Sequence, residues 1–145
     1  MGARRAGDVR AASGYTPTVA FHHRHYTVEE ANGTLPMVGS LIRRVRDARR
    51  RLAGEGFDTE FATHTELTGG AWPGDEHAAA AVEIALGFDC LEELDVVVRD
   101  LERGLVDFPS LIDGEEAYLC WLLDEPSVRH WHAVEAGFGG RRPLA

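Results

Sequence analysis

The chain of 145 residues contains no Lys, because all 15 of its basic residues are Arg. It has only two cysteines, Cys90 and Cys120. Such a low count favours a reduced protein with small buried thiols over a fold held together by disulfides. No run approaches the ~18 apolar residues that a membrane span requires. The first 25 residues carry basic side chains without a continuous apolar segment, so we expect no secretory signal and a cytoplasmic location.

The net charge of -9 is unevenly distributed along the chain. Residues 1–53 carry 10 Arg against 4 acidic residues, whereas residues 54–145 carry 5 Arg against 20 acidic residues. The acidic second part makes a nucleic acid an unexpected partner, because such binding depends on neutralised phosphates. The basic first part could contact an acidic partner. The favoured interpretation is that it faces the acidic part of its own chain or of a second copy.

The length is typical of one domain. Residues 1–24 show no apolar period and are predicted to form a disordered arm, followed by a single domain over residues 25–145. His22, His23 and His25 resemble a metal cluster. We interpret them as solvated side chains, because no acidic or Cys partner stands at ligand spacing.

Two helices are predicted in the first two thirds of the chain. Thr27 and Glu30 form a capping box that predicts where the first helix begins, and Gly54 is a typical stop. Pro36 is expected to kink this helix or to delay its regular part. Apolar residues recur at steps of three and four: Val28, Ala31, Leu35, Val38, Ile42, Val45 and Leu52.

Residues 54–75 are predicted to be a flexible loop, because they are rich in Gly and Thr and lack a period. Asp75 can cap a second helix. This helix is expected to pack antiparallel on the first through Ala78, Ala79, Val82, Ala85, Leu86, Leu91 and Leu94.

After Asp95 the pattern changes to short β-rich runs at 96–98, 105–108, 117–123 and 128–134. Pro109 is expected to end the second run, Asp113-Gly114 predicts a hairpin turn, and residues 135–144 read as a Gly-rich tail. The predicted fold is α+β: a long antiparallel helical hairpin packed on a small antiparallel sheet of three to four strands.

His130 and His132 stand two residues apart, which places both on one face of a strand and Trp131 on the other. They could share a divalent metal ion, with Glu135 or Asp107 supplying a carboxylate. The favoured alternative is a pair of half-exposed histidines that are hydrogen-bonded to carboxylates.

Asp107 lies inside an apolar strand, where a carboxylate needs a partner. A structural ion pair is favoured, with Arg99, Arg103 or Arg141 as the partner. A role as general acid or base requires a histidine within hydrogen-bond reach. Cys120 is expected to be a buried, inert thiol.

Several segments together resemble the bacterial domain-of-unknown-function family 2203. They are YTVEEAN at 26–32, Leu35-Pro36, Arg99-Asp100, GLVDFP at 104–109, LCW at 119–121, Trp131-His132, Gly137-Phe138 and Arg141. The resemblance covers residues 26–53 and 78–144 and implies no established activity. The chain departs from the family pattern in two places. Asp124-Glu125 replaces a Gly-Glu pair, and Ala133 follows Trp-His where a Glu is usual, so Glu135 would have to supply that carboxylate.

Two functions remain open. The favoured hypothesis is an interaction module that self-associates through its first helix, as a homodimer. The alternative is a small metal- or acid/base-dependent enzyme acting on an anionic small molecule. Polar residues gathered on one sheet face would favour the enzyme, and an apolar face would favour the module. The candidate residues are Asp107, His132 and Glu135 for catalysis, His130 and His132 for metal, and Arg99, Arg103, Trp121, Trp131 and Arg141 for ligand binding.

Overall fold

The computed structural model describes residues 21–54 and 72–144. Most of the predicted N-terminal arm and most of the predicted loop at 54–75 lie outside the described residues. The elements are α2 (Val28–Gly54), α4 (Trp72–Glu93), β1 (Val97–Asp100), β2 (Leu105–Ile112), β3 (Glu115–Leu122), β4 (His130–Ala133), the 3-10 turn η1 (Phe138–Gly140) and β5 (Arg142–Pro143). The α+β class is therefore confirmed.

The sheet has five antiparallel strands in the order β1-β2-β3-β4-β5, so each strand pairs with its neighbour in sequence. The predicted three to four strands are corrected to five, because the Gly-rich tail returns as the short strand β5 beside β4. Short connections leave successive strands no other arrangement than antiparallel pairing.

Helix α2 begins at the predicted capping box. The Glu30 N–H donates to Thr27 Oγ1 at 3.1 Å, and the Thr27 N–H donates to the Glu30 carboxylate at 3.4 Å. The helix continues through Pro36 to Gly54. Its buried side is formed by Ala31, Leu35, Val38, Gly39, Ile42, Val45 and Ala48. The predicted apolar seam thus faces the interior of this chain.

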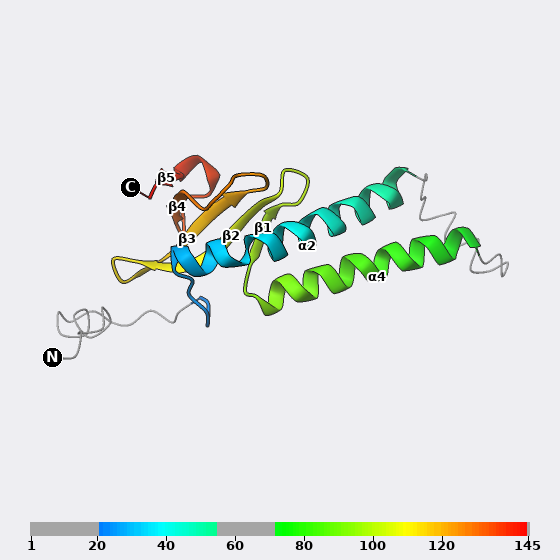
Figure 1. Cartoon of the computed structure of the whole chain (residues 1–145), viewed down its shortest axis with the longest axis horizontal. Coiled ribbons are helices and arrows are strands. Elements are labelled where there is room, and N and C mark those ends of the chain that lie inside the picture. Colours follow the sequence, from blue (N-terminus) through cyan, green and yellow to red (C-terminus); the bar gives the residue numbers. More distant parts are fainter. Residues whose placement is uncertain (1–20, 55–71, 145) are drawn as a thin grey trace.

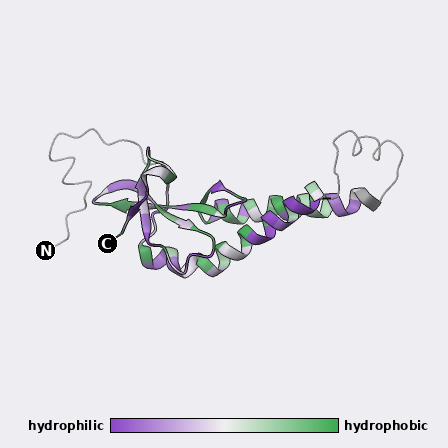
Figure 2. Ribbon diagram, turned by 90° about the horizontal axis from the view of Figure 1, so that it is seen from above, coloured by the Kyte–Doolittle hydropathy of each residue, from purple (hydrophilic) through white to green (hydrophobic). Residues whose placement is uncertain are grey.

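The hydrophobic core lies between α2 and one face of the sheet. Val106 and Phe108 of β2 and Leu119 and Trp121 of β3 are buried there against the helix. Figure 1 shows the first part of α2 crossing the sheet, while the rest of α2 runs beside α4 beyond the edge of the sheet. In the view of Figure 2 the sheet lies at one end and the helical pair extends away from it. Only part of the hairpin therefore packs on the sheet.

Over most of its length, helix α4 turns a different side toward α2 than the sequence predicted. Only Leu91 and, just past the end of the helix, Leu94 lie in or against the core as expected. The buried residues of α4 are His77, Ala80, Gly87 and Leu91. Of the residues expected at the helix contact, Ala78, Ala79, Val82, Ala85 and Leu86 are exposed. The helix also begins at Trp72, so Asp75 lies in its first turn rather than at its cap.

Four arginines of α2 pair with acidic residues of the same chain, as the favoured interpretation of the charge pattern expected. Their partners lie in α4 and in the loops of the sheet: Arg43–Asp124, Arg44–Glu83, Arg50–Glu102 and Arg51–Glu83. Exposed pairs of this kind contribute little to stability, but they show where the positive charge of the helix is used.

Pro109 lies inside β2 instead of ending it. The short strand β1 pairs with β2 only from Leu105 to Asp107, so beyond Asp107 that side of β2 has no β1 partner. The missing N–H of Pro109 therefore costs no β1–β2 hydrogen bond. Its carbonyl instead accepts the Tyr26 N–H at 2.6 Å.

The predicted Asp113-Gly114 turn is confirmed. Asp113 and Gly114 have φ of 52° and 80°, as a tight hairpin turn between β2 and β3 requires. Within residues 21–54 and 72–144, neither helix combines the length and the apolar character that crossing a membrane would require.

Candidate functional site

A polar group lies on the sheet face that points away from α2. Asp107 of β2 pairs with Cys120 of β3, which pairs with His130 of β4, and Tyr118 of β3 pairs with His132. Because side chains alternate along each strand, all five point to this second face. The prediction that His130 and His132 share a face is confirmed.

Asp107 is the buried centre of the group, with 0% of its surface exposed. Its Oδ2 accepts a hydrogen bond from Arg99 Nε at 2.7 Å and lies 2.9 Å from His132 Nε2. Its Oδ1 is buried and has no hydrogen-bond partner among the described residues. The partner expected for a buried carboxylate is thus Arg99, and a histidine lies within hydrogen-bond reach, which was the condition for acid/base chemistry.

His132 is held at both ring nitrogens. Nδ1 lies 2.8 Å from the carbonyl oxygen of Ala133, which can only accept, so Nδ1 carries a hydrogen in this contact. The 2.9 Å contact between Nε2 and the Asp107 carboxylate then needs one further proton between the two atoms. The Asp107–His132 pair therefore shares a proton in a place from which water is largely excluded.

Cys120 lies beside this pair. Burial and the Asp107 carboxylate raise the pKa of its thiol to about 11, against an opposing effect of Arg141. The ligand atoms of Asp107, Cys120 and His132 all lie within 4.8 Å of one another. A thiol at this pKa stays protonated at neutral pH, as an inert buried cysteine would. The sequence did not indicate that Cys120 lies beside Asp107 and His132.

A cleft of about 310 Å³ opens above the group. It is lined by Arg99, Asp100, Leu105, Asp107, Cys120, His132, Val134, Gly137 and Phe138. The Arg99 side chain is 41% exposed, so part of its guanidinium is accessible. At the rim, the guanidinium groups of Arg103 and Arg141 lie 4.8 and 5.3 Å from the centre of the Phe138 ring. The cleft thus combines a buried carboxylate, thiol and imidazole with the partly exposed guanidinium of Arg99, while the nearby Arg141 guanidinium pairs with Glu125.

Other predicted residues lie elsewhere. Trp121 and Trp131 alternate with the cleft residues, so they face α2, and Trp121 is buried in the core. Both were ligand-binding candidates from the sequence, but Trp121 lies in the core, Trp131 packs against it, and neither lines the cleft. Glu135 is exposed and lies outside the cleft lining. His130 Nδ1 lies 3.8 Å from the Glu125 carboxylate, so the two histidines face different acids rather than one shared position.

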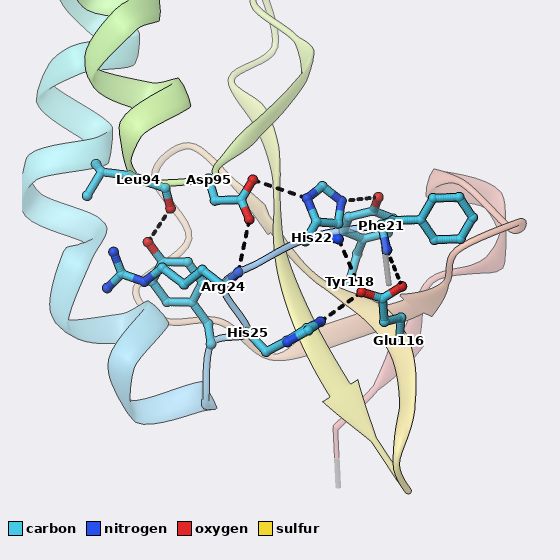
Figure 3. A network of polar contacts seen from close by, with 9 residues as sticks. Phe21, His22, Arg24, His25, Leu94, Asp95, Glu116 and Tyr118 are labelled. Carbon is cyan, nitrogen blue, oxygen red and sulfur yellow. Dashed lines mark hydrogen bonds and ion pairs between the residues drawn. The ribbon is translucent and has the colours of Figure 1, made fainter. Parts of the chain in front are cut away.

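Residues 21–25 contact Asp95 and two residues of β3, Glu116 and Tyr118, as Figure 3 shows. His22 Nε2 lies 2.8 Å from the Tyr118 hydroxyl, and His22 Nδ1 lies 3.1 Å from Asp95. The Tyr118 ring in turn lies 5.4 Å from the His132 ring, and the Arg99 guanidinium lies 4.8 Å from the Tyr118 ring centre. The interpretation of His22 as a solvated side chain is therefore wrong.

Glu116 anchors the same segment. It accepts hydrogen bonds from the backbone N–H groups of Phe21 and His22, at 2.9 and 3.3 Å, and lies 2.8 Å from His25 Nε2. Burial raises the pKa of Glu116, but the Phe21 N–H, the His25 ring and the His22 N–H outweigh it, so the pKa lies below its ordinary value. His25 is thus paired too, and only His23 of the three histidines is exposed. These partners lie far along the chain, so no local pattern could have revealed them.

Comparison with known proteins identifies the family. The model of a family described as "Uncharacterized conserved protein (DUF2203)" matches residues 24–144, so the chain belongs to this family. No curated protein and no solved structure match the chain. Since the family description assigns no activity, the function has to be argued from the site.

Proposed function

We propose that this protein is a small enzyme that acts on an anionic small molecule in the cleft on the second face of the sheet. The observation that carries the proposal is the buried carboxylate of Asp107, which contacts Arg99 and His132 and keeps one oxygen unpartnered among the described residues. The polar residues gather on one sheet face, which is the arrangement that favours an enzyme over an interaction module. Buried polar groups beside a cleft are the default pointer to a reactive site.

Arg99 is the residue proposed to bind the anion. Burial lowers its pKa, but its hydrogen bond and charge interaction with Asp107 raise it more, so the side chain stays positively charged. Its Nε is occupied by Asp107, while a guanidinium carries five N–H donors in all. The exposed part of the fork can therefore bind a carboxylate or a phosphate group. Arg103, beside Phe138 of the cleft lining, adds positive charge there, whereas the charge of Arg141 is paired with Glu125.

Asp107 and His132 supply the reactive groups. Their shared proton can be given to a substrate or taken from one, which is the property required of a general acid or base. The imidazole and the carboxylate could instead hold a metal ion, and the buried thiol of Cys120 lies within reach of both. Either chemistry would act next to an anion held by Arg99.

Anion binding tests the proposal directly. Thermal shift and calorimetry would compare phosphate, sulfate and short carboxylates on the wild type, on Arg99→Lys and on Arg129→Gln. Arg99→Lys keeps the charge beside Asp107 but removes the fork, and exposed Arg129 lies outside the cleft lining. We expect at least one anion to bind to the wild type and to Arg129→Gln, and about tenfold more weakly to Arg99→Lys. Equal affinity for all three proteins, or binding of none of these anions, would contradict the proposal.

Self-association is a second candidate, and one observation favours it. Ala78, Val82, Leu86 and Cys90 recur every four residues on α4 and are all exposed, which leaves an apolar stripe on the helical pair. The seam of α2 is buried within the chain, so it no longer supports an interface through the first helix. Sedimentation of the wild type and of Leu86→Glu over the micromolar range tests this candidate. A wild-type monomer throughout that range would exclude it.

A further inference from the structure

The buried group of Asp107, Cys120 and His132 offers three different ligand atoms from three neighbouring strands. The carboxylate, thiol and imidazole atoms lie within 4.8 Å of one another, and all three residues are buried. Ligands of a tetrahedral zinc ion, at about 2.0–2.3 Å from the metal, lie about 3.3–3.8 Å apart. Side-chain adjustments of about 1 Å would therefore bring these atoms to ligand spacing.

His132 is already oriented as a ligand. Its Nδ1 hydrogen points to the Ala133 carbonyl oxygen at 2.8 Å, which turns Nε2 toward Asp107, 2.9 Å away. Metal-binding histidines in proteins typically donate their second N–H to a carbonyl or a carboxylate in this way. A cation bound to Nε2 would take the place of the hydrogen bond between Nε2 and Asp107 Oδ2.

Asp107 has one carboxylate oxygen that could bind a metal ion. Arg99 and His132 both contact Oδ2, whereas Oδ1 is buried and unpartnered among the described residues. Burying a carboxylate oxygen without a partner costs free energy, so the unpartnered Oδ1 suggests that a ligand binds there. Oδ1 could bind a cation while Arg99 keeps its hydrogen bond to Oδ2 and neutralises part of the negative charge.

We propose that Asp107, Cys120 and His132 form a binding site for one divalent transition-metal ion, with zinc as the best fit. This inference rests on the function proposed above for the location of the substrate, and it identifies the reactive centre of that cleft. One imidazole, one thiolate and one carboxylate are the donors that zinc accepts, whereas magnesium and calcium prefer oxygen alone. Three protein ligands leave a fourth position, which would face the cleft and the anion held by Arg99.

The thiol gives the proposal a distinctive pH dependence. A cysteine binds a metal ion as its thiolate, so the Cys120 thiol has to lose its proton when the ion binds. Metal binding deprotonates a coordinating thiol and releases protons. The affinity for the metal should therefore rise as the pH rises over the neutral range.

Titration of the full-length, chelator-treated protein with Zn²⁺ and Co²⁺ tests the site. Co²⁺ reports thiolate ligation and tetrahedral geometry through its absorption spectrum. The variants are Cys120→Ser, which changes one atom, and His132→Gln. The matched controls are Cys90→Ser, at an exposed cysteine, and His130→Gln, at the other histidine of β4. Circular dichroism of each variant verifies its fold.

We expect one equivalent of metal per wild-type chain, a thiolate–cobalt band, and proton release on binding. Cys120→Ser should lose the band and bind zinc at least about 100-fold more weakly, since even residues that only hydrogen-bond to the ligands of a metal contribute about 10–100-fold. Both controls should bind as the wild type does. Absence of a thiolate–cobalt band in the wild type, or unchanged zinc affinity in folded Cys120→Ser, would overturn the proposal.

The outcome for the metal can be separated from the outcome for the anion. Metal binding is measured without any anion of the panel, and anion binding is measured on metal-free wild type and Arg99→Lys. If the protein binds an anion but no metal ion, the metal site is refuted, and the proposed enzyme would use Asp107 and His132 as an acid/base pair. If the metal binds but Arg99→Lys binds the anions as tightly as the wild type does, the metal site is supported and the proposed anionic substrate is refuted.

Discussion

Replacing Gly87 by Ala should destabilise the protein, although Ala normally stabilises a helix by about 1 kcal/mol relative to Gly. A Cβ at position 87 would lie 2.2 Å from Val45 Cγ2, where an ordinary contact is 3.4–4 Å. Val45 is buried in α2 and its β-branched side chain has one strongly preferred rotamer, so the methyl group cannot swing away. Overpacking of this kind costs about 1–3 kcal/mol. At 2.2 Å we expect a cost in the upper part of this range, about 2–3 kcal/mol, so that a net loss of about 1–2 kcal/mol in the free energy of unfolding remains after the helix gain.

A double-mutant cycle with Val45→Ala isolates the contact. Removing the γ-methyl groups leaves the Cβ of residue 45, which lies 3.7 Å from the Cβ added at position 87, an ordinary contact distance. Val45→Ala alone leaves a cavity and should cost about 1–3 kcal/mol. In the double mutant the methyl group added at position 87 fills part of that cavity. The double mutant should thus be more stable than the sum of the single losses predicts, by about 1 kcal/mol or more.

Urea denaturation followed by helical circular dichroism gives the four free energies, provided that the slope with denaturant stays constant. Gly33→Ala is the matched control in α2, because nothing lies within 4 Å of its added Cβ. It should raise stability by up to about 1 kcal/mol. If Gly87→Ala were as stable as the wild type, or if the effects of the two mutations were additive, the contact with Val45 would not require a glycine at position 87.

Three further outcomes are expected. Thr27→Ala should lower the free energy of unfolding by about 1 kcal/mol in chemical denaturation, because it removes the side-chain cap of α2. The lowered pKa of Glu116 means that its ionised form stabilises the folded state above the unfolded-state pKa. Glu116→Gln should therefore be less stable than the wild type at neutral pH, with a gap that closes as acid protonates the wild-type carboxylate. Glu135→Gln, at an exposed glutamate, controls in the same pH series for the loss of one negative charge. With a thiol-specific reagent, native protein should react rapidly at exposed Cys90 and, because burial raises the pKa of the other thiol, at Cys120 only after denaturation. Rapid reaction of two thiols would contradict this.

Local signals in the sequence determined the start of α2, its apolar seam and the hairpin between β2 and β3. The Thr27–Glu30 cap and the Asp113-Gly114 turn each depend on residues a few positions apart, so their geometry can be read without the rest of the fold. The alternation of a strand likewise sufficed to place His130 and His132 on one face. The burial cost of a carboxylate sufficed to predict that Asp107 would have a charged partner.

The contact face of α4 and the course of β2 through Pro109 depended on the tertiary structure. Helix α4 is rich in Ala and apolar on more than one side, so its sequence does not decide which side meets α2. The side of α4 that contacts α2 is the one that carries Gly87, because only a residue without a side chain leaves room there for Val45. Pro109 is tolerated because β1 ends before it, a fact that no pattern within β2 contains.

The candidate site was the part least determined by the sequence. Asp107, Cys120 and His132 lie on three separate strands, and each was interpretable alone as a paired acid, an inert thiol and a strand histidine. Only the register of β2, β3 and β4 brings their side chains together. That register follows from the hairpin turn and from the burial of the opposite face against α2, because a slip by one residue would exchange the two faces of a strand. The sequence determined which residues could carry chemistry, and the pairing of the strands decided which of them meet.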